Sequence, residues 1–179
     1  VLIILIFVYR KYFKEETIDS LAINKDEITK TENNLINIEY ESVDREGRRY
    51  IITAETGNFK KEKSELIIMT NVNAKIFLLD GSVIYINSLN AEYNTLIYNT
   101  KFHKEVNMKF LEHHIFCENL NIFFDKNLIE AFNNLNYKNL DIIMLADKIE
   151  IDLLTKNSKI YNFNENKVII KNRNLDGDS

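Results

Sequence analysis

The sequence predicts an all-β fold made of stacked antiparallel strands. The strongest observation is a tetrapeptide, Val-Asn-Ala-Lys at positions 72–75, which returns in related form at 106–109 and 135–138. A second is the alternation of apolar and polar side chains from Leu35 onward, which has the two-residue period of a half-buried strand. A third is the hairpin signal Asp-Gly at 80–81, which lies between two apolar runs. A repeat of roughly 30 residues indicates supersecondary units that stack on one another.

A small residue precedes each tetrapeptide by the same distance and marks the first strand of each unit. An apolar residue lies two positions before this small residue, and two others lie three and five positions after it. A partial fourth copy keeps this signature but lacks the tetrapeptide. Before the first unit, an Asp-Arg-Glu-Gly turn at 44–47 follows an earlier strand with alternating apolar and polar residues. The small residues are Ala54, Ser88, Cys117 and, in the partial copy, Ala146.

Alternation divides each unit into an inward row and an outward row. In the first strand, Ile52 and Ala54 share the inward face, and the later units repeat this arrangement. In the tetrapeptide strand, the first and third residues point inward, whereas the Asn and the Lys point into solvent. A middle strand is expected around Leu66 and Ile68, so each unit should contribute about three short strands to one stack.

The first nine residues, 1–9, are apolar and are followed by Arg10 and Lys11. Because a transmembrane helix takes about 20 residues and the chain does not begin with Met, we expect the end of a transmembrane helix that starts upstream. A buried strand is the alternative, and the lack of a small-residue cleavage site disfavours a signal peptide. The positive-inside rule would place the charged side in the cytoplasm. The expected organisation is the end of the helix at 1–13, a polar spacer at 14–34 and a β domain at 35–175.

Composition and motifs exclude several classes of function. The net charge is −4 and no Lys/Arg cluster is interleaved with aromatic residues, so nucleic acid is not an expected partner. The single cysteine, Cys117, excludes an intrachain disulfide and is expected to be a packed small residue. His113 and His114 face opposite sides of a strand, and with His103 they form no convergent zinc site. Without phosphate-loop, hydrolase or metalloprotease motifs, we expect no catalytic residue, no metal, no cofactor and no enzymatic activity.

The inward rows suggest a binding function instead. A sheet pair lined by Ile, Val, Met and Phe holds an alkyl chain if it is open along one side. Each CH₂ group removed from water contributes about 0.8 kcal/mol, so such a groove strongly stabilises a bound acyl chain. The rows themselves are equally compatible with an ordinary packed core.

Several short motifs resemble the LptC family of lipopolysaccharide export proteins, within the OstA-like group that includes LptA. The resemblance extends from Ile36 to about Lys171, and the order of membrane anchor, spacer and repeats matches as well. The chain has fewer glycines than the family, and Asn stands at some expected turns. The residues that bear the resemblance are Asn37-Ile38-Glu39-Tyr40, Gly47, Tyr50-Ile51-Ile52-Thr53-Ala54-Glu55, Asn71-Val72, Asp80-Gly81, Ala91-Glu92-Tyr93-Asn94 and Ala146-Asp147-Lys148-Ile149-Glu150.

The resemblance implies a periplasmic OstA-like β-jellyroll preceded by a single inner-membrane helix. Such a protein receives lipopolysaccharide from an inner-membrane ABC transporter of the LptB, LptF and LptG type and passes it to an LptA-like periplasmic bridge protein. The acyl chains lie in the apolar interior, and the edge strands join neighbouring jellyrolls. The alternative function is a membrane-tethered structural or adhesive β-repeat protein without lipid cargo.

The resemblance also assigns roles to two sets of residues. The last strand candidate supplies a partner edge at Val168, Ile169 and Ile170. The expected lipid contacts, taken from strand alternation, are Ile52, Ala54, Ile68, Val72, Ala74, Ile76, Ile84, Ile86, Val106, Met108, Phe110 and Ile122.

Overall fold

The computed structural model describes residues 34–163 and 167–172, and these contain ten strands and one short 3-10 turn. The transmembrane segment expected at 1–13, nearly all of the spacer at 14–34 and the end of the domain at 173–175 lie outside the described residues. Among the residues that are described, no helix has the length and apolarity needed to cross a membrane. The elements are β1 (Asn34–Val43), β2 (Arg49–Lys60), β3 (Lys63–Phe77), β4 (Val83–Asn94), β5 (Thr100–Phe110), β6 (His113–Phe123), η1 (Phe124–Lys126), β7 (Leu128–Lys138), β8 (Ile142–Asp152), β9 (Ser158–Tyr161) and β10 (Ile169–Asn172).

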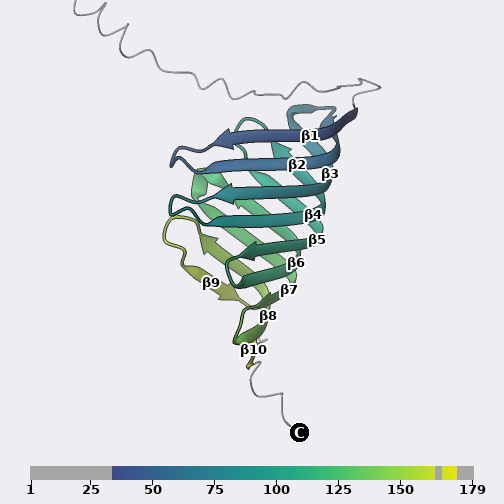
Figure 1. The fold of residues 1–179 in the computed structure, drawn as a ribbon. Helices are drawn as coiled ribbons and strands as arrows, with labels where there is room; N and C mark the ends of the chain where they lie inside the picture. The colour runs from purple at the N-terminus through teal and green to yellow at the C-terminus, as the bar shows by residue number, and fades with distance from the viewer. Residues whose placement is uncertain (1–33, 164–166, 173–179) are drawn as a thin grey trace, which may run out of the picture.

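The strands form one antiparallel sheet in which neighbours in sequence are also neighbours in space. The order runs from β1 to β8 and then β10, and β9 also pairs with β8. Figure 1 shows this sheet folded over into a front and a back layer, with β1 at one end and β9 and β10 at the other. The predicted all-β antiparallel architecture is therefore confirmed, and the sheet is open, as in a β-jellyroll.

The predicted division into three short strands per unit is wrong. Each unit is a hairpin of two long strands, such as β2 with β3 or β4 with β5. The middle strand expected at Leu66 and Ile68 and the strand that contains Val72 are two halves of β3. A change of alternation inside one bent strand resembles a strand boundary in the sequence, which explains the error.

In most long strands the inward row changes parity at the bend, whereas β5 and β7 keep their parity because each has two successive residues of positive φ there. In β3, Ile67 and Met69 are buried before the bend, and Val72 and Ala74 are buried after it. Between them, Asn71 has a φ of 51° and is skipped in the pairing with β2. Asn adopts this left-handed conformation more readily than most residues. Its positive φ reverses the alternation of β3 without a register shift against β2, where Glu55 is skipped as well. The other odd-numbered strands from β1 to β7 have positive φ at Asn37, Lys104, Glu105, Asn133 and Asn134.

This bend corrects the predicted position of Ile68. The prediction continued the parity of Val72 backward and placed Ile68 in the interior, but its side chain is 39% exposed. Its neighbours Ile67 and Met69 are fully buried instead. The shift at Asn71 moves every residue before it to the opposite face, because side chains alternate along a strand.

The small residues of the repeat lie on the inner side of the bend, as predicted. All of them are buried, and the larger first residue of each tetrapeptide lies beside them on the adjacent strand. Small side chains at the corner let the two layers approach each other without voids. The paired positions are Ala54 with Val72, Val72 with Ser88, Val106 with Cys117, and Leu135 with Ala146.

A buried ion pair organises the turn between β1 and β2. The turn predicted at 44–47 is present, and it encloses charged side chains: that of Arg48 is 1% exposed and that of Asp44 is 6% exposed. Arg48 Nε donates to Asp44 Oδ2 at 2.6 Å, and Arg48 Nη2 donates to Glu46 and to Asn127. Because Asn127 precedes β7, Arg48 joins two turns that are far apart in the sequence.

Candidate apolar binding cavity

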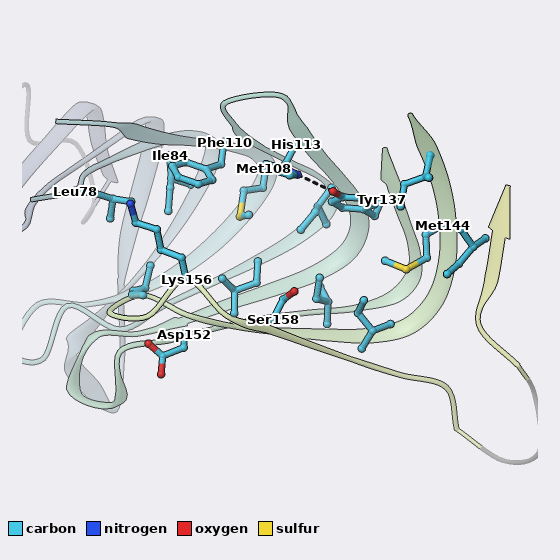
Figure 2. A pocket seen from close by; sticks show the side chains of 17 residues that line it. Leu78, Ile84, Met108, Phe110, His113, Tyr137, Met144, Asp152, Lys156 and Ser158 are labelled. Atoms are coloured by element: carbon cyan, nitrogen blue, oxygen red, sulfur yellow. Dashed lines mark hydrogen bonds between the residues drawn. The ribbon is translucent and has the colours of Figure 1, made fainter. Parts of the chain in front are cut away.

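The inward side chains leave an apolar cavity at the end of the sheet that carries β9 and β10. Its volume is about 320 Å³, which is at the lower end of the roughly 300–1,000 Å³ typical of small-molecule pockets. Figure 2 shows Ile84, Met108 and Phe110 along one wall, with Asp152 and Ser158 on the opposite side. The remaining apolar lining consists of Leu78, Ile115, Ile142, Met144, Ile149, Ile151, Leu153, Ile160 and Ile170.

The cavity arises because the last strands are too short to continue the stack. β8 has eleven residues, whereas β9 and β10 have four each. β9 pairs with residues 148–151 of β8, and β10 pairs with residues 142–145. The inward side chains of β8 therefore lack the full layer of neighbours that the earlier strands have.

One polar pair interrupts the apolar wall. His113 Nδ1 and Tyr137 Oη lie 2.6 Å apart, on β6 and β7 respectively. Partial burial raises the pKa of Tyr137, so its phenol remains a neutral hydroxyl at neutral pH. The pair offers hydrogen bonds to a polar group that enters the cavity.

Lys156 crosses the rim of the cavity from the turn after β8. Its side chain extends toward Leu78 (Figure 2) and forms an ion pair with Asp80 in the turn between β3 and β4. The ammonium group also lies 6.0 Å from the centroid of the Phe110 ring. Hydrogen bonds from Lys156 and Ser82 hold the pKa of Asp80 well below its ordinary value. The rim is therefore charged, while the interior is apolar.

Three of the twelve predicted lipid contacts, Ile84, Met108 and Phe110, line the cavity. Ile68 does not, because it faces outward. The other eight are buried in the packed core and do not line the cavity: Ile52, Ala54, Val72, Ala74, Ile76, Ile86, Val106 and Ile122.

Most of the cavity wall consists of residues outside the predicted set of lipid contacts. Ile115 and Met144 belong to the repeat signature and have the inward parity, so the same alternation could have included them. His113 and Tyr137 were not expected to face the interior as a polar pair. Leu153 and Lys156 come from an irregular turn, where alternation has no predictive value.

The predicted partner edge lies at the end of the sheet, as expected. β10 starts at Ile169 and pairs with β8 on one side only. Ile169 is 50% exposed and Ile170 is 62% exposed, whereas Val168 precedes the strand and packs against the core. Ile170 additionally lines the cavity.

The candidate metal ligands and nucleophile do not converge. In the described part of the chain, no three His, Cys, Asp or Glu side chains form a metal-binding group. His103 Nδ1 lies 2.8 Å from Asn119 Oδ1, and Cys117 is buried with its thiol donating to the backbone oxygen of Asn119. Burial raises the pKa of Cys117 to about 12, so the thiolate needed for nucleophilic attack does not form at neutral pH.

The fold and the cavity define a class: an open antiparallel β-jellyroll with an apolar interior. A solved structure with this fold is LptH from Pseudomonas aeruginosa, described as the LptA-homologous periplasmic component of the conserved lipopolysaccharide transport device. The TM-score is 0.53 at 6% sequence identity, over 68% of this chain and 93% of that one. No protein-family model matches the sequence, and the curated proteins give no significant match. The similarity to LptH concerns the fold.

Proposed function

We propose that this protein is a non-enzymatic component of lipopolysaccharide transport that shields acyl chains in its apolar cavity. The observation that carries the proposal is the cavity itself, an apolar space of about 320 Å³ in an open jellyroll. The fold shared with LptH supports the same function.

The more specific part of the proposal is an LptC-type role. In this role the main domain lies in the periplasm and is anchored to the inner membrane by the apolar segment at 1–13. It receives lipopolysaccharide from an ABC transporter of the LptB, LptF and LptG type and passes it to an LptA-like protein. The motifs that resemble LptC and the apolar N-terminal residues support this role.

Site-specific photo-crosslinking tests the lipid contact. A crosslinker at Met108, which lines the cavity, should capture lipopolysaccharide. One at Lys101, which lies on the same strand and is exposed, should not. One at Ile52, which is fully buried and does not line the cavity, should also fail. Equal capture at Met108 and Lys101 would refute the interior site.

A pair of proline substitutions tests the partner edge. Successive backbone N–H groups of a strand point to opposite sides, so Ile169→Pro and Ile170→Pro remove donors that face different neighbours. One variant should weaken pairing with β8 and lower stability, and the other should weaken capture of an LptA-like protein while leaving the fold intact. If neither variant changes that capture, β10 is not the partner edge.

The alternative function, a structural or adhesive repeat without lipid cargo, requires a fully packed interior. The cavity counts against it. Mass spectrometry of gently purified protein distinguishes the two functions, because only the transport function predicts a co-purifying lipid that added lipopolysaccharide displaces.

A further inference from the structure

The outer face of the sheet carries a row of lysines that the repeat places on alternate strands. Lys75 of β3 pairs with Tyr85, which pairs with Lys109 of β5. The row continues through His114 to Lys138 of β7, and from there through Ile143 to Lys171 of β10. Because adjacent strands are about 4.8 Å apart, successive lysines of β3, β5 and β7 are separated by about 9–10 Å.

This lysine row is segregated from acidic residues. The chain has a net charge of −4, yet the row contains no Asp or Glu from β3 to β10. None of its four lysines lies in an ion pair with another described residue, whereas Lys60, Lys148 and Lys156 all do. The row therefore presents positive charge of one sign that an anion lying along it can neutralise.

A second row beside the lysines is rich in amides. Asn73 pairs with Asn87, which pairs with Asn107, and Phe116 and Asn136 follow on β6 and β7. The side-chain oxygens of Asn107 and Asn136 are buried and have no hydrogen-bond partner among the described residues. Because these two oxygens are closed off from solvent, the amides that a ligand can reach are those of the exposed Asn73 and Asn87. An amide both donates and accepts hydrogen bonds, so these two side chains suit a ligand with hydroxyl groups.

Aromatic rings complete the surface. Tyr85 is 48% exposed in the lysine row, and Phe116 is 39% exposed in the amide row. Lys138 Nζ lies 5.6 Å from the centroid of the Phe116 ring. Exposed rings next to cations and amides can pack against the apolar faces of sugar rings, which neither phosphate nor a simple ion provides.

We propose that these two rows form a binding surface for an acidic oligosaccharide that lies across the strands. Its carboxylate or phosphate groups would pair with Lys75, Lys109 and Lys138, and its hydroxyl groups would exchange hydrogen bonds with Asn73 and Asn87. A flexible chain fits better than a flat membrane, because a twisted sheet rotates its outer face from strand to strand. The surface is on the opposite side of the sheet from the apolar cavity and does not depend on the proposed lipid function.

The test compares variants in binding oligogalacturonate, a carboxylated sugar chain. Replacing Lys75, Lys109 and Lys138 together by Gln should weaken binding about tenfold, since each exposed charge contact contributes modestly. The control replaces Lys61, Lys63 and Lys101 by Gln, which changes the net charge equally but leaves both rows intact. Thermal unfolding should be similar for the two variants.

Three further ligands define the specificity. Neutral maltoheptaose should bind more weakly than oligogalacturonate, and vesicles of phosphatidylglycerol should not bind through these lysines. Asn87→Ala should weaken the binding of oligogalacturonate but not that of linear polyphosphate, which has no hydroxyl groups along its chain. Equal loss in the control variant, equal binding of maltoheptaose or lysine-dependent vesicle binding would each overturn the proposal. So would an Asn87→Ala variant that binds oligogalacturonate as tightly as the unmodified protein does.

Discussion

Replacing Arg48 by Met should strongly destabilise the protein. The guanidinium is buried and donates to Asp44, to Glu46 and to Asn127, so its loss removes three interactions at once. Asp44 would remain as a largely buried carboxylate, although it would keep hydrogen bonds from the backbone N–H groups of Glu46 at 3.1 Å and residue 48 at 2.8 Å. The turn itself should therefore persist.

The magnitude follows from two opposing contributions. Removing one partner of a buried ion pair typically costs about 3–5 kcal/mol. Arg48 Nη1 has no hydrogen-bond partner among the described residues, so the substitution also relieves a desolvation cost of about 1 kcal/mol. We expect the free energy of unfolding to fall by about 3 kcal/mol, a large part of the roughly 5–15 kcal/mol that stabilises a typical domain.

Urea unfolding followed by circular dichroism measures this change. Arg49→Met is the matched control, because Arg49 pairs with Glu41 on the exposed surface and its loss should have a much smaller effect. Adding Asp44→Asn to Arg48→Met should restore part of the stability by removing the uncompensated charge. A fall of less than about 1 kcal/mol for Arg48→Met, or no difference from Arg49→Met, would refute the reasoning.

Two further predictions concern the bend and the buried thiol. Ile67→Ala should lower the free energy of unfolding by about 2–5 kcal/mol, and Ile68→Ala by less than about 1 kcal/mol, because only Ile67 is buried. If urea unfolding gives similar losses of stability for the two variants, the change of parity at the bend is contradicted. Cys117 should react with Ellman's reagent at pH 8 only after unfolding, since its pKa is about 12. As the pH rises from 9 toward 12, the unfolded thiol ionises first, so stability should fall more than in Cys117→Ala.

Local alternation was sufficient to predict the class of fold and most of the core. Ile52, Ala54 and Val72 are buried as expected, and Asn73 and Lys75 are exposed. This succeeds because side-chain direction along a strand depends only on the neighbouring residues. It failed at Ile68, because whether an Asn such as Asn71 adopts positive φ depends on the pairing with the adjacent strand.

The candidate cavity could be predicted only in part. Ile84, Met108 and Phe110 were expected to face inward, but nothing in their spacing showed that they border open space. The open space exists because the stack of strands ends there: the two short strands β9 and β10 pair with different halves of β8. The lysine row was also hidden in the sequence. The tetrapeptide predicted one solvated Lys in each repeat, but these lysines are far apart in the chain and form no basic cluster there.

The sequence by itself determined the repeat, the strands and the inward and outward sides, since these follow from short-range periodicity. Only the tertiary structure decided where the strands bend, which buried side chains enclose a cavity, and that Lys75, Lys109 and Lys138 form one continuous surface. The physical reason is that register joins residues about 30 positions apart across hydrogen-bonded strands. Side chains that are solitary in the chain thereby become neighbours in the sheet.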